Sequence, residues 1–321
     1  MHPGYEVDRC YGPTRHMATL TVRHVTTYRY AKPVVLGEHR MMLRPRDSHN
    51  LRILSSRLAI APQPAAVRWL HDVFENSVAV AAFAEPASEL KIESEIQIEH
   101  YESTETDCPI EEYAVTYPFS YSAGDAPDLT RSIERHYPDP NHEVDGWART
   151  FLNRNGPTNT LAMLEAMTGF VQRDGFTYAA RVAEGVQNPV DTLHMRSGSC
   201  RDFALLMIEA LRSLGLAARF VSGYLYVPGA DGAANVGGGA THAWVQIYLP
   251  ASGWIEFDPT NAKVGNRDLI RVAVARDPAQ AVPVSGTWTG APADFLGMTV
   301  DVSVSAGAAK PIQNSPPPPV H

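Results

Sequence analysis

The segment 196–203 (RSGSCRDF) places a cysteine at the point where a Ser/Gly turn becomes an apolar helix. With Ser199 as the N-cap, Cys200 is the first helical residue, where unpaired amides and the positive end of the helix dipole stabilise a thiolate. The N–H group of Cys200 would also face an oxygen that gains negative charge on an attacked carbonyl. The apolar stripe of this helix begins at Phe203, so Cys200 need not belong to the packed face. We therefore predict a thiol nucleophile, with a buried structural cysteine beside Ala204 as the alternative.

A thiol nucleophile needs a base, and the base needs a group that orients it. His242 opens a strand of alternating pattern, and the next strand carries Glu256 and Asp258 on one face. A short turn between the strands pairs His242 with roughly position 260, which leaves Asp258 diagonally beside it at ~7–8 Å. Glu256 lies two residues farther along, so the register favours Asp258. Taken alone, a strand histidine is more often structural, and an aspartate before a proline is commonly a turn residue.

The elements that must position these residues follow from periodicity. Residues 142–153, 159–173 and 200–214 have helical spacing, and the last of these helices ends at Gly215. Residues 218–225, 240–249 and 254–258 read as strands. From 19 to 100 the pattern has period two, and in 90–98 the apolar residues alternate with charged or polar ones. These runs predict an antiparallel sheet packed as a small sandwich.

Composition excludes several classes of protein. The 321 residues are 44% hydrophobic and 19% charged, which is typical of a globular chain of about two domains. The net charge is −8 with no basic block, so nucleic acid is not an expected partner. We find no apolar run of ~20 residues and no secretion signal, so we expect no membrane association and a cytoplasmic location. Cys10, Cys108 and Cys200 form neither a disulfide framework nor a zinc motif.

Three segments together resemble a known family: GSCRDFALLMIEALRSLGLAARFVSGY, THAWVQIYL and GWIEFDPTN. They are similar to the transglutaminase-like core of bacterial proteins, a relative of the papain-type thiol fold. The resemblance covers roughly residues 159–261, and residues 19–98 resemble the β-rich N-terminal region that accompanies this core. It implies that Cys200 is the nucleophile, His242 the base and acid, and Asp258 the orienting group.

The resemblance also implies the fold. We expect an α+β chain: a papain-like, transglutaminase-like core of helices packed on an antiparallel sheet, preceded by an all-β, sandwich-like N-terminal domain. The expected division is a flexible extension (1–16), a β-rich domain (17–105), a connecting segment (106–140), the catalytic core (141–300) and a disordered Pro-rich tail (301–321).

The expected activity is cysteine-dependent acyl transfer to an amine, or hydrolysis, at a peptide or isopeptide amide through a thioester. Tyr178 is a candidate second oxyanion donor by resemblance, although a packed tyrosine is the commoner role. The alternative function is a non-catalytic binding or scaffold module on the same fold. A metal site of His142, His194, His242 and Cys200 has no ligand spacing to recommend it, so no metal or cofactor is implied.

The role of one segment, and several properties of the protein, remain open at this point. The Gly-rich segment 227–240 is either a flap beside the cleft or a plain insertion, and it lacks a phosphate-binding motif. The expected partner is a peptide or protein amide substrate. The oligomeric state and the choice between hydrolysis and transamidation do not follow from the residues.

Overall fold

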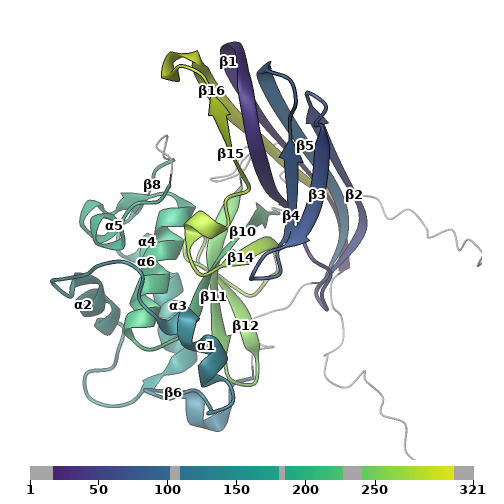
Figure 1. Cartoon of the computed structure of the whole chain (residues 1–321). Coiled ribbons are helices and arrows are strands. Elements are labelled where there is room, and N and C mark those ends of the chain that lie inside the picture. The colour runs from purple at the N-terminus through teal and green to yellow at the C-terminus, as the bar shows by residue number, and fades with distance from the viewer. Residues whose placement is uncertain (1–16, 102–108, 181–184, 227–240, 307–321) are drawn as a thin grey trace, which may run out of the picture.

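The chain folds into a strand-rich half and a mixed helix–sheet half, shown in the computed structural model of Figure 1. The structure describes residues 17–101, 109–180, 185–226 and 241–306. The expectations for the N-terminal extension, the Gly-rich segment, the Pro-rich end, Cys10 and Cys108 therefore lie outside the described residues. The α+β architecture with an all-β N-terminal unit is confirmed.

The N-terminal unit is a strongly curved antiparallel sheet organised by one very long strand, β1, which spans 28 residues. The first part of β1 pairs with β5 and β16, and its second part pairs with β4 and β15, so the sheet bends into a half-barrel. On β5 the apolar positions from Leu90 to Ile98 are buried, as the alternation predicts. The strands of this unit are β1 (Met17–Arg44), β2 (Leu51–Ala61), β3 (Ala66–His71), β4 (Ser77–Ala82), β5 (Ala87–Tyr101), β15 (Val284–Thr289) and β16 (Phe295–Ala306).

The last two strands in the described part of the chain complete this N-terminal sheet. Strands β15 and β16 pair antiparallel with β1, and Val302 is buried against it. The sequence predicts that residues 284–300 belong to the catalytic core and 301–306 to a disordered tail, whereas the structure forms β15 and β16 there. Residues 299–305 alternate valine with polar residues, but this run is short and follows a stretch with several Gly, Ala and Pro residues. Pairing with the distant strand β1 places it in the N-terminal sheet.

The second unit is an antiparallel five-stranded sheet in the order β13-β12-β11-β10-β14. The long helix α6 packs on one face, where Val245, Ile247 and Phe257 belong to the same buried cluster as the helix side chains. The bounds agree closely with the expectations for residues 200–214, 218–225 and 254–258. The elements are α6 (Cys200–Ser213), β10 (Ala218–Leu225), β11 (His242–Leu249), β12 (Gly253–Asp258), β13 (Lys263–Val264) and β14 (Leu269–Ala275).

Shorter helices surround α6. The helix expected over 159–173 is two helices, because the chain breaks at Gly169, and the one expected over 142–153 is shorter. Among the described residues, no helix is long and apolar enough to cross a membrane. The remaining elements are β6 (Thr116–Tyr117), α1 (Ala126–Ile133), α2 (Glu143–Arg149), β7 (Thr158–Asn159), α3 (Thr160–Thr168), α4 (Phe170–Arg173), β8 (Thr177–Tyr178), α5 (Pro189–Met195) and β9 (Ser197–Gly198).

A buried ion pair fixes α6 to its surroundings. The side chains of Glu209 and Arg212 are fully buried and lie 2.9 Å apart. Arg212 also donates to the carbonyls of Ala218 and Arg276, and Glu209 accepts from Arg135. A buried pair with this many additional hydrogen bonds is tolerated, whereas loss of either partner would leave an uncompensated charge. The helix is therefore locked against both the sheet and the segment before α2.

The N-terminal sheet packs against the core through an apolar cluster that joins the two units. Leu20, Ile96 and Ile98 from the first sheet meet Tyr224 and Ile270 from the second. A buried histidine lies at this seam: Nδ1 of His24 is 3.1 Å from the hydroxyl of Tyr224, and its Nε2 is 2.8 Å from Thr26 Oγ1.

Burial at this seam predicts a loss of stability in acid. Desolvation lowers the pKa of His24 from 6.5 to about 4, so the folded protein keeps the ring neutral while the unfolded chain binds a proton below pH 6.5. Unfolding free energy should therefore fall as the pH drops from 6.5 to about 4, by about 3 kcal/mol in total. Urea unfolding at several pH values measures this slope.

The matched variant is His24→Gln, which keeps a polar side chain without a titrating ring. It should show a clearly shallower decline over the same pH range, with a residual slope because burial also lowers the pKa values of His39 and His100. Identical slopes in the two proteins would contradict the assignment to His24.

Candidate active site

A tightly hydrogen-bonded turn presents Cys200. Ser199 is the N-cap and the helix begins at Cys200, as predicted. The buried Asp202 carboxylate accepts from the N–H and the hydroxyl of Ser199, both at 2.8 Å, and from the N–H of Gln187 at 2.6 Å. A Cβ at Gly198 would lie 2.9 Å from the Cβ of Asp202, so only glycine fits there. The turn and the first helical turn are thereby held as one rigid piece.

The thiol is more enclosed than the apolar stripe had suggested. Cys200 is 5% exposed and belongs to the main buried cluster together with Phe203 and Ala204. The sequence leaves Cys200 free to lie outside the packed face, but the structure buries it with the helix stripe. Its surroundings are not purely apolar, however, since His242 and Tyr178 both interact with it.

His242 and Asp258 form a buried pair at adjacent ends of β11 and β12. Nε2 of His242 lies 2.8 Å from Oδ2 of Asp258, and the two side chains are 1% and 0% exposed. The strand register pairs Gln246 with Glu256, which places Asp258 diagonal to His242, as predicted. Glu256 instead accepts a hydrogen bond from the amide of Gln246 at 2.7 Å. The choice of Asp258 over Glu256 as the partner of the histidine therefore agrees with the geometry.

Electrostatics keep this pair charged. Burial alone would lower the pKa of His242, but the Asp258 carboxylate and Cys200 outweigh burial and raise it to about 10. Burial likewise acts to raise the pKa of Asp258, but the charge and hydrogen bond of His242 and the hydrogen bonds from Asn261 and Thr260 bring it below its usual value. The raised pKa of His242 and the lowered pKa of Asp258 both favour the charged forms, so the stable form is an imidazolium–carboxylate pair.

The other ring nitrogen remains free for chemistry. Because Nε2 is taken by Asp258, Nδ1 is the buried nitrogen without a hydrogen-bond partner among the described residues. Cys200 lies near enough to raise the pKa of the ring, although the sulfur makes no hydrogen bond to Nδ1 within standard limits. Long contacts of this kind are common in free enzymes and tighten when substrate binds.

Tyr178 also lies beside the thiol. It forms a short parallel pairing with Gly198, and the N–H of Ala179 donates to the Gly198 carbonyl at 2.9 Å. Burial, and then the charge of Cys200, raise the pKa of Tyr178 to about 12, so its hydroxyl stays protonated at neutral pH. The structure thus brings Cys200, His242, Asp258 and Tyr178 together.

Two residues of this site were missed in the sequence. Trp244 is fully buried and stacks on His242 with ring centroids 5.8 Å apart, and Gly223 leaves room for its ring. Asn261 donates from Nδ2 to Oδ2 of Asp258 at 2.7 Å. The segment DPTN after the strand carries a usable signal, because an aspartate often accepts hydrogen bonds from the residues that follow it.

The two other histidines of the metal-site alternative, His142 and His194, pair with carboxylates. His142 pairs with Asp145 at 2.8 Å, and His194 pairs with Glu143. No group of three or more His, Cys, Asp or Glu side chains arranged to hold a metal ion occurs in the part of the chain that the structure describes.

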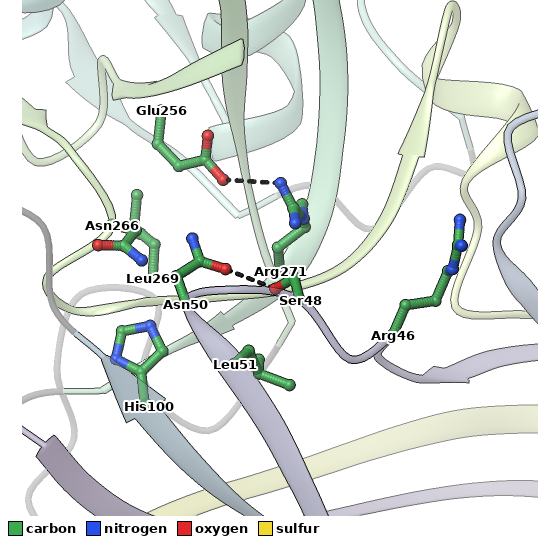
Figure 2. A pocket seen from close by; sticks show the side chains of 9 residues that line it. All are labelled: Arg46, Ser48, Asn50, Leu51, His100, Glu256, Asn266, Leu269 and Arg271. Atoms are coloured by element: carbon green, nitrogen blue, oxygen red, sulfur yellow. Dashed lines mark hydrogen bonds and ion pairs between the residues drawn. The ribbon is translucent and has the colours of Figure 1, made fainter. Parts of the chain in front are cut away.

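A separate polar cavity lies where the two units meet, and it belongs to the seam. Figure 2 shows Glu256 and Arg271 facing each other across it, with their charged groups 3.5 Å apart. On the N-terminal side Ser48 donates to Asn50 at 2.6 Å, and His100 points into the same space. Its lining includes neither Cys200 nor its partners.

Comparison with known proteins agrees with this geometry. The model of the bacterial transglutaminase-like N-terminal region matches residues 20–99, and that of the transglutaminase-like superfamily matches residues 148–259. An uncharacterised protein of Mycobacterium bovis is 31% identical over 90% of this chain and 93% of its own length. A protein-glutamine gamma-glutamyltransferase of Pseudomonas aeruginosa is 32% identical over 31% of this chain and 15% of its own length.

A solved structure from Cytophaga hutchinsonii, named as a candidate cysteine protease, has the same fold. It is 18% identical, covers 94% of this chain and 95% of its own, and has a TM-score of 0.67. The similarity to the Mycobacterium bovis protein covers nearly the whole chain, and the two family regions occur in the expected order. The chain belongs to the transglutaminase-like superfamily and carries the bacterial transglutaminase-like N-terminal region before the core.

Proposed function

We propose that this protein catalyses acyl transfer from a peptide or protein amide through a thioester on Cys200. The observation that carries the proposal is the buried His242–Asp258 pair at 2.8 Å, which leaves Nδ1 of the ring for a thiol at a helix N-terminus. Membership of the transglutaminase-like superfamily supports the same class of chemistry.

In the first half-reaction the Cys200 thiolate attacks the amide carbonyl, a C–S bond forms, and the carbonyl oxygen becomes an oxyanion. The N–H of Cys200 and the hydroxyl of Tyr178 hold this oxygen. When the tetrahedral species collapses, the C–N bond breaks and the Nδ1 proton of the His242 imidazolium goes to the departing amine. The products are a thioester on Cys200, a free amine and a neutral imidazole.

In the second half-reaction an acceptor attacks the thioester while His242 takes its proton. Water as acceptor gives hydrolysis, and an amine gives a new amide, and in both cases the thiolate–imidazolium pair is restored. The resemblance to a protein-glutamine gamma-glutamyltransferase supports an amine as acceptor, although it covers only 15% of that relative.

Replacement of the nucleophile tests the proposal directly. Cys200→Ala should lower turnover of a responsive peptide amide by at least ~10³-fold, because no thioester can form. Mass spectrometry of the wild-type protein should find the acyl group on the Cys200 peptide. A Cys10→Ala/Cys108→Ala double variant is the control and should keep its activity. Full activity in Cys200→Ala would exclude the proposed role.

Thiol reactivity provides a test that needs no substrate. Iodoacetamide should modify Cys200 rapidly near neutral pH, and His242→Ala should slow the reaction by roughly tenfold or more, because the imidazolium stabilises the thiolate. The rate is followed on the Cys200 peptide by mass spectrometry. A slow rate that is indifferent to His242 would favour the alternative of a binding or scaffold module.

The role of Asp258 has a defined pH signature. Without its charge, burial dominates and the pKa of His242 falls from about 10, so the ring loses its proton at lower pH. In Asp258→Asn the alkaline limb of the kcat/KM profile should therefore move to lower pH, and the maximum rate should drop by about 10²–10⁴-fold.

The neighbouring Glu256→Gln variant is the matched control for this change. Glu256 occupies the same strand but bonds to Gln246, so its alkaline limb should stay where it is in the wild type. An unmoved limb in Asp258→Asn would mean that Asp258 does not set the charge of the ring.

A further inference from the structure

The carboxylate of Asp258 has more partners than the histidine. Its Oδ1 accepts from the backbone N–H groups of Thr260 at 3.0 Å and Asn261 at 3.4 Å. Its Oδ2 accepts from His242 Nε2 at 2.8 Å and from the Asn261 amide at 2.7 Å. A fully buried carboxylate needs such donors, because nothing else replaces its lost hydration. Asn261 supplies two of the four.

The backbone and side-chain hydrogen bonds from Asn261 to Asp258 have different roles. The backbone N–H groups already close the turn after β12, so the turn does not need the side-chain amide. That amide goes to Oδ2, the oxygen used by the histidine, and its nitrogen lies 3.3 Å from Nε2 of His242. Both nitrogens are donors, so the amide and the ring do not bond to each other but converge on one oxygen. The amide therefore fixes where Oδ2 sits relative to the ring.

We infer that Asn261 is a positioning residue that holds Oδ2 of Asp258 in line with Nε2 of His242, and so aims Nδ1 at Cys200. This role rests on the proposed function of the site and extends it by one residue. Asn261 acts through Asp258 and touches neither the nucleophile nor the carbonyl under attack.

The backbone geometry after Asn261 supports this role. Ala262 has a φ of 51°, a left-handed conformation that is uncommon for a residue with a side chain. The chain turns sharply there, directly after Asn261, before it continues as β13. A side-chain hydrogen bond at the start of such a turn keeps Asn261 half-buried against the pair and not in solvent.

The charged groups around the His242–Asp258 pair determine how its pH dependence can be interpreted. Cys200 and Tyr178 interact directly at the site, and the charge of Arg201 also acts on Cys200. Lys263 lies opposite Asp258 in the strand register, but its ammonium group pairs with Asp268. The other titratable group on the same strand is Glu256, which faces Arg271 and Gln246.

The test compares Asn261→Ala with the wild-type full chain by the pH dependence of Cys200 alkylation with iodoacetamide. Loss of the amide weakens the alignment of Asp258 and also removes a hydrogen bond that lowers its pKa. Both effects destabilise the thiolate–imidazolium pair in acid. The acid limb should move to higher pH by about one unit, and the rate on that limb should fall roughly tenfold.

The control is Asn266→Ala, in the segment that leads to β14. Asn266 is buried and donates to the carbonyl of Tyr101 at 3.2 Å, away from the pair. This variant should melt at a lower temperature and keep the wild-type pH profile, which separates positioning from a general loss of stability. Asn261→Ser, which keeps both backbone donors, is the second variant and should shift the limb in the same direction.

The outcomes separate the two proposals. A slow wild-type reaction that His242→Ala leaves unchanged would remove the proposed function. A fast, His242-dependent wild-type reaction with an unmoved limb in folded Asn261→Ala would overturn the role of Asn261 alone. If Asn261→Ala does not fold, an unmoved limb in Asn261→Ser overturns it equally.

Discussion

The arrangement depends on one buried electrostatic interaction, the ion pair between His242 and Asp258. Charges without access to water are costly, and the attraction between them repays the cost only when the remaining polar atoms are also bonded. Asp258 meets this condition with four donors from His242, Thr260 and Asn261. His242 meets it on one side only, because Nδ1 has no partner among the described residues. The nitrogen without a partner is on the side of Cys200, and the proposed reaction depends on this asymmetry.

The rest of the fold brings three element ends together and keeps them there. The helix start is held by Asp202 and the helix body by the Glu209–Arg212 pair, so Cys200 cannot shift without breaking buried hydrogen bonds. The strand ends with His242 and Asp258 are adjacent through an ordinary antiparallel register. The half-barrel packs beside β10 and β14, where its apolar side chains bury Tyr224 and Ile270 (Figure 1). The half-barrel therefore contributes to the site only indirectly, by stabilising the sheet that carries His242 and Asp258.

Local rules predicted the parts of the site that local physics decides. Capping placed Ser199 and Cys200, and strand register chose Asp258 over Glu256, because both depend on residues a few positions apart. Three features were missed, and the first two of them depend on distant parts of the chain. The burial of Cys200 depends on segments that cover the helix start, and β15 and β16 depend on pairing with β1. The hydrogen bond from Asn261 needs the folded turn, and nothing in DPTN alone shows that its amide reaches Oδ2.

The enclosure of Cys200 also bears on the order of events in the proposed reaction. The Cys200 residue is only 5% exposed, and in the proposed reaction its sulfur carries one acyl group while Nδ1 of His242 carries the proton in both half-reactions. The first amine must take the proton from Nδ1 and leave before an acceptor can approach the same nitrogen. Donor and acceptor therefore use the site in turn, which is the ping-pong order expected of covalent catalysis. The choice between water and an amine is then made after the thioester has formed, by whichever reaches Nδ1 first.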